Sequence, residues 1–101
     1  MESRPARPVL DAARFRLASR VAARLVGQAH ADDATLEAVA ILTADADPAR
    51  ASRLRPRAGE PAPLVERLAM WALPRATDTA VARAHEVLDP NLHAITGHLV
   101  R

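Results

Sequence analysis

The chain has 101 residues, the length of a single domain, and a net charge of only +2. It contains no cysteine, which excludes disulfides, thiol catalysis and cysteine-based zinc sites. Alanine supplies 24 of the 101 residues and aromatic residues only 2%, so burial of apolar surface, at about 25 cal/mol per Å², builds a thin core. Association with a second copy would supplement such a core, so we expect a homo-oligomer.

The N-terminal residues predict an arm rather than a leader. Residues 1–8 contain two prolines and two arginines, which predicts a flexible N-terminal arm before a helical domain over residues 9–101. The arm has no apolar stretch of signal-peptide length. No apolar run in the chain approaches the roughly 20 residues of a membrane span. We therefore expect a cytoplasmic protein without membrane contact.

Helical periodicity is clearest in the first half of the chain. Leucine and valine recur at helical spacing over residues 9–29, which predicts the first helix, with Gly27 in its last turns. Asp32 or Asp33 can cap a second helix over residues 34–44. That helix is apolar nearly all round, which is typical of a helix at the centre of a bundle or at an oligomer interface.

Prolines divide the second half. Asp47-Pro48 predicts the start of a short helix over residues 48–55, which Pro56 ends. A loop with two prolines and a glycine then leads to a fourth helix over residues 63–73. One face of that helix consists of Leu64, Leu68 and Trp71, and Pro74 ends it. Thr77, Asp78 or Thr79 can cap a fifth helix that runs to Leu88. Asp89-Pro90 then predicts the start of a last helix over residues 90–100.

These patterns predict the fold class. No alternating run of apolar and polar residues is long enough for a strand. The sequence therefore predicts an all-α fold, a compact bundle of five to six short helices in a single domain. The last of these helices would place Leu92, Ile95 and Leu99 inward.

Arginines of the first helix form the first candidate binding site. Projected at 100° per residue, Arg16, Arg20 and Arg24 share an arc opposite the apolar face. Arginine side chains also cover apolar surface while their charged ends stay in water. Asp11 is the single acid of this helix, so no other acid within the helix offsets the repulsion between these arginines. The stripe therefore either meets acids of another helix or is open to an acidic partner.

Arg14 differs from the other arginines because it projects into the apolar arc of the same helix. An unpaired charge is costly to bury. Two outcomes are open: the side chain reaches water near the start of the helix, or it pairs with a carboxylate.

The segment 35–57 has the outline of a helix-turn-helix. A short arginine-rich helix follows an apolar one, and arginine can pair bidentately with guanine in the major groove. The turn has no glycine and the second helix is short, which both depart from that motif. The residues that would contact DNA are Arg50, Ser52, Arg53, Arg55 and Arg57.

The sequence contains no pattern that is typical of a catalytic or cofactor-binding site. The three glycines are far apart, so no phosphate loop is predicted, and no serine has the context of a nucleophile. His93 and His98 are five positions apart, which does not stack two metal ligands on one helical face. We expect no cofactor, no metal and no enzyme activity.

The sequence favours a protein–protein interaction or regulatory module that self-associates, using Arg16, Arg20, Arg24 and the Trp71 face, with a DNA-binding regulator as the alternative.

Overall fold

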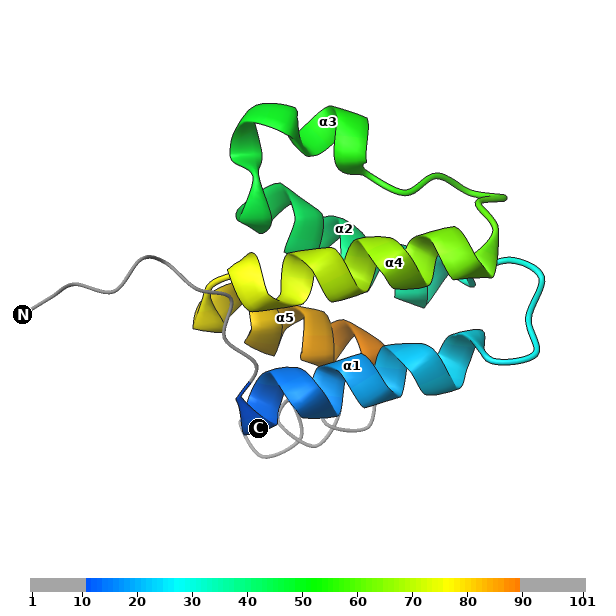
Figure 1. Ribbon diagram of the computed structural model, residues 1–101, viewed down its shortest axis with the longest axis horizontal. Helices are drawn as coiled ribbons and strands as arrows, with labels where there is room; N and C mark the ends of the chain where they lie inside the picture. Colours follow the sequence, from blue (N-terminus) through cyan, green and yellow to red (C-terminus); the bar gives the residue numbers. More distant parts are fainter. Residues whose placement is uncertain (1–10, 90–101) are drawn as a thin grey trace, which may run out of the picture.

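The computed structural model describes residues 11–89, and these residues form five α-helices and two short 3-10 segments (Figure 1). The predicted arm and the predicted last helix lie outside the described residues. The elements are α1 (Ala12–Leu25), α2 (Asp33–Ala46), η1 (Pro48–Arg50), α3 (Ala51–Leu54), α4 (Ala62–Ala72), η2 (Leu73–Arg75) and α5 (Asp78–Leu88).

The predicted all-α fold is confirmed. The described part of the chain contains no strand, and its extended pairing is limited to an isolated antiparallel bridge between His30 and Pro61. In Figure 1, α1 runs along the lower side, α3 lies at the top, and α4 crosses between them. The helices pack as one compact unit, as expected for a single domain.

The ends of α1 follow from two residues. Asp11 caps the helix, because its carboxylate accepts a hydrogen bond from the Arg14 amide at 2.9 Å. Gly27 lies just beyond the end of α1 with a φ of 76°, in the left-handed region that glycine adopts at low cost. The helix therefore ends at Leu25, four residues before the predicted end at residue 29.

The second helix lies at the centre of the bundle. It packs against α3, α4 and α5, and it buries Ala38, Val39 and Leu42 fully. Asp32 is the N-cap, since its carboxylate accepts a hydrogen bond from the Thr35 amide at 2.9 Å. The all-round apolar sequence is thus accounted for mainly by neighbours within the same chain.

The second half of the chain also follows its predicted boundaries closely. The short helix expected after Asp47-Pro48 is a 3-10 turn followed by the four residues of α3. Pro74 lies in η2, directly after α4. Thr77 caps α5 through a hydrogen bond from the Ala80 amide to its hydroxyl at 3.2 Å.

The core is built from small side chains. Seven of the sixteen buried apolar residues among those described are alanine, and none is aromatic. The largest contributions come from leucines of α1, α2, η2 and α5, namely Leu17, Leu42, Leu73 and Leu88. Alanine at helix contacts lets backbones approach closely, but each buried alanine removes little apolar area from water.

Arg14 joins α1 to the turn between α4 and α5. Its side chain is 8% exposed, and its Nη1 atom donates to Asp11 and to Asp78, both at 2.9 Å. Its Nε atom donates to the carbonyl oxygen of Leu73 at 2.9 Å, and Nη2 donates to that of Ala76. Of the two outcomes that the sequence left open, pairing with carboxylates is therefore the one observed.

Candidate binding groove

The outer face of α4 carries the largest apolar side chains of that helix. The residues that α4 buries are Ala62, Val65, Ala69 and Ala72. Leu64, Leu68 and Trp71 share a neighbouring face, as their spacing predicts, and together we call them the apolar strip. Leu64 is 39% exposed, and the other two are half-buried. The strip therefore covers part of the core and also presents apolar surface to solvent.

An arginine-rich segment borders this strip. Residues 50–57 contain four arginines and no acid. Leu54 is half-buried and Pro56 is buried, so the segment is attached to the bundle through its apolar residues. The three arginines at positions 53, 55 and 57 are exposed and make no ion pair with any of residues 11–89.

The segment and α4 enclose a groove of about 390 Å³. Its apolar lining comes from Leu54 and Pro56 on one side and from Leu64 and Leu68 on the other. Charged side chains also line it, namely Arg53, Arg55, Arg57 and Glu60. We call this hollow the α4 groove. Its apolar floor and its excess of positive charge suit an apolar segment that carries acids.

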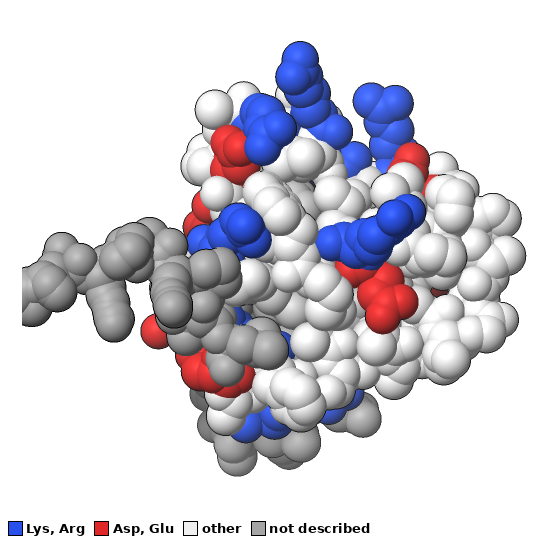
Figure 2. Space-filling model, in the orientation of Figure 1, with Lys and Arg blue, Asp and Glu red and all other residues white. Residues whose placement is uncertain are grey.

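Figure 2 shows this side of the molecule, with arginine side chains gathered over α3 and along α4 around surface that is largely uncharged. Trp71 lies one turn beyond Leu68 on the strip. The Arg75 guanidinium lies over its ring, 5.0 Å from the centroid, and donates from Nη1 to the Trp71 carbonyl oxygen at 2.7 Å. This contact holds one side of the indole, and the ring is half-buried.

Two residues of the predicted DNA-contact set are placed differently. The Arg50 guanidinium is paired with Asp47 at 2.8 Å, and this hydrogen bond is the main cause that lowers the pKa of Asp47. Ser52 is exposed but does not line the α4 groove. The groove therefore brings together three of the five residues in that set.

The predicted stripe on α1 divides into two parts. Arg24 bonds across the turn to α2, with Nη2 at 2.7 Å from Asp32 and Nε at 3.0 Å from the Thr35 hydroxyl. Hydrogen bonding with Thr35 and then with Arg24 holds the pKa of Asp32 below its usual value. Arg16 and Arg20 are exposed and form no ion pair with the described residues. Arg24 thus meets an acid from another helix, whereas the other two stand open to solvent.

The sequence identified the parts of the groove without joining them. The arginines were assigned to a helix-turn-helix and Trp71 to a separate apolar face. The short loop after Pro56 joins the arginine-rich segment to α4. It contains Gly59 with a φ of 89°. Its geometry returns the chain toward α1, where the Ala62 amide donates to the Ala29 carbonyl oxygen at 3.0 Å.

Within residues 11–89, no three histidine or acidic side chains cluster as a metal site requires. Of the helices described there, none combines the length and the apolar character that a bilayer-spanning segment needs. Comparison of the chain with protein-family models, with curated proteins and with solved structures gives no match.

Proposed function

We propose that the protein is a non-enzymatic interaction module whose α4 groove binds an acidic, apolar segment of a partner protein. The observation that carries this proposal is the position of the apolar strip. Leu64 and Leu68 lie on an open face, while alanines of the same helix fill the core. Covering that face with apolar side chains would remove further apolar area from water.

Charge complementarity defines the partner. Three arginines of the groove lack an ion pair with the described residues, and Glu60 is the single acid of its lining. Aspartate or glutamate on the partner would pair with guanidinium groups bidentately. An amphipathic helix with acids beside its apolar face meets both requirements, and helix-in-groove binding is a recurring mode of peptide recognition.

The same geometry disfavours the DNA-binding alternative. A recognition helix presents several successive side chains to base edges in the major groove. Here α3 has four residues, and Arg50 beside it is already paired with Asp47. The remaining arginines border a concave apolar hollow, which fits a protein segment better than the edge of a duplex.

The test is a binding titration with a labelled helical peptide in which leucines at positions i, i+4 and i+7 alternate with glutamates. Binding is followed by anisotropy and by the fluorescence of Trp71, the single tryptophan of the chain. Arg53→Glu and Arg57→Glu should each weaken binding by about 10-fold or more, since charge-assisted contacts contribute about 1.5–3 kcal/mol. Arg20→Glu is the matched control, because Arg20 is also exposed but lies on α1.

A peptide with the same composition and a scrambled order separates groove binding from general attraction between charges. Equal binding of both peptides, or equal loss in the Arg20 and Arg53 variants, would overturn the proposal. Absence of binding by the ordered peptide counts against it as well. Tighter binding of a 20-base-pair duplex than of the peptide, with a steep dependence on salt, would favour the DNA-binding function.

Self-association remains a prediction from the thin core. Among residues 11–89, the large apolar side chains that are exposed are Phe15, Val26, Leu64 and Met70. Phe15 lies on α1, Val26 directly follows it, and Leu64 and Met70 lie on α4. Light scattering should give a mass above that of one chain, whereas a monomeric mass throughout a concentration series would contradict the prediction.

A further inference from the structure

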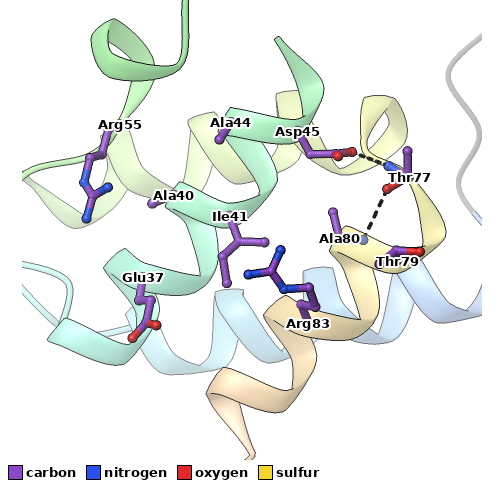
Figure 3. A pocket seen from close by; sticks show the side chains of 10 residues that line it. All are labelled: Glu37, Ala40, Ile41, Ala44, Asp45, Arg55, Thr77, Thr79, Ala80 and Arg83. Carbon is purple, nitrogen blue, oxygen red and sulfur yellow. Dashed lines mark hydrogen bonds between the residues drawn. The ribbon is translucent and has the colours of Figure 1, made fainter. Parts of the chain in front are cut away.

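A second hollow, on the other side of Arg55, combines charged side chains with a small apolar floor. It lies between α2 and α5, has a volume of about 560 Å³, and is floored by Ala40, Ile41, Ala44 and Ala80 (Figure 3). Ala40 and Ile41 are half-buried. Small-molecule sites are typically concave and mainly apolar, whereas the lining of this hollow is more polar than apolar, which suits a small charged ligand.

Two guanidinium groups reach this hollow from different elements. In Figure 3, Arg83 extends from α5 beside Ile41, and Arg55 extends toward α2 from the chain after α3. Neither guanidinium lies within ion-pair distance of a carboxylate among the described residues. Both are therefore free to receive an anionic group of a ligand.

The two acidic residues of the lining differ in their hydrogen bonding. The Asp45 carboxylate accepts a hydrogen bond from the Thr77 amide at 2.6 Å, which fixes it at the start of α5 (Figure 3). Glu37, at the other end of the hollow, makes no hydrogen bond or ion pair with the residues that the structure describes. The hollow thus presents guanidinium groups, one unengaged carboxylate and an aliphatic floor.

We propose that this hollow binds a small zwitterion with an aliphatic body, of the class of an aliphatic α-amino acid. Its carboxylate pairs with Arg83, its ammonium group with Glu37, and its side chain packs on Ile41 and the alanines beside it. A ligand with both charges satisfies both signs of the lining, whereas a simple anion faces Glu37 and a simple cation faces two arginines. This site is separate from the α4 groove, although Arg55 lines both.

The experiment is a titration of protein with labelled isoleucine methyl groups, followed by NMR. The chain has two isoleucines, Ile41 and Ile95. The methyl signal of Ile41, in the floor of the hollow, is therefore assigned by substituting Ile95. The probes are L-leucine, 3-methylbutylamine, which lacks its carboxylate, and 4-methylpentanoate, which lacks its ammonium group. We expect saturable shifts of the Ile41 methyl with leucine and affinities lower by about 10-fold or more for the other two probes.

Variants complete the test. Arg83→Gln and Glu37→Gln should each weaken leucine binding by about 10-fold or more, while Arg20→Gln, an exposed residue of α1 that lines neither hollow, should leave it unchanged. Equal binding of all three probes, no shift at about 10 mM leucine, or unchanged binding in Arg83→Gln would overturn the proposal. Since Arg83 does not line the groove, failure here is distinguishable from failure of the peptide titration. Circular dichroism of each variant checks that the helices are retained.

Discussion

The Nη1 atom of Arg14 lies 2.9 Å from the Oδ1 atom of Asp78, a residue 64 positions later in the chain. The Asp78 side chain is 93% exposed, so water screens this pair. The hydrogen bonds from Arg14 to the carbonyl oxygens of Leu73 and Ala76 are the buried part of the contact. The structural value of Arg14 therefore comes mainly from the two carbonyl groups that it satisfies.

Substitution of Arg14 tests this division. Arg14→Leu should lower the free energy of unfolding by about 2–4 kcal/mol, because two buried carbonyl groups lose their donors. Asp78→Asn should cost much less, since the exposed pair contributes little. Both values come from urea unfolding followed by circular dichroism. Equal costs for the two variants would show that the ion pair, and not the carbonyl contacts, carries the stability.

Asp32 should make the stability depend on pH in the acid range. Its pKa is lowered in the folded protein, so the folded state holds this carboxylate deprotonated more strongly than the unfolded chain does. The resulting stabilisation is present above the unfolded-state pKa of about 3.9 and is lost as the pH falls through the lower folded-state pKa.

Asp32→Ala removes both the cap and the partner of Arg24, and we expect it to cost about 1 kcal/mol near neutral pH. Asp32→Asn should cost less, because asparagine is also a good N-cap residue. Urea unfolding at several pH values between about 3 and 7 measures both effects. An alanine variant whose stability falls with acid as steeply as that of the unchanged protein would contradict the role of Asp32.

The backbone of Gly27 predicts the effect of adding a side chain there. Its φ is 76°, and a Cβ atom built at this position meets nothing within 4 Å. The cost of Gly27→Ala is therefore conformational rather than steric, about 1 kcal/mol. Gly27→Asn should cost less, because asparagine adopts this region more readily. Thermal unfolding of the two variants should rank them in that order, and the reverse order would refute this explanation.

Substitutions on the two faces of α4 should differ in their effect on stability. Val65 is fully buried, so Val65→Ala should lower the free energy of unfolding by about 2 kcal/mol. Leu64 is 39% exposed, and Leu64→Ala should lower it by about 1 kcal/mol. The same leucine variant should weaken the acidic peptide. A larger loss of stability from Leu64→Ala than from Val65→Ala would mean that the strip belongs to the core.

Local chemistry made much of the fold predictable. Asp32 and Thr77 were among the candidate caps, because short polar side chains bond the free amides of a first turn, and proline marked the boundaries near 48 and 74. The length of α1 was overestimated, because alanine and arginine favour continuation of a helix and only the geometry of Gly27 ends it.

The tertiary relationships were less predictable. The spacing of Leu64, Leu68 and Trp71 defines a face of α4 but does not say whether that face or the one with alanines is buried, since close helix packing selects the small residues. The apolar arc placed Arg14 inward, yet its acceptors at Leu73 and Ala76 come from a turn some 60 residues away. No local sequence pattern predicts such a contact.

The segment over residues 48–61 that forms one wall of the α4 groove adds little to the core. Neither η1 nor α3 contains a buried residue, and Pro56 is the main buried anchor. A unit with so few buried contacts opens at a lower free energy than the whole fold. Its amide hydrogens should therefore exchange with solvent well before those of α2 and α5, and a segment bound in the groove should slow that exchange.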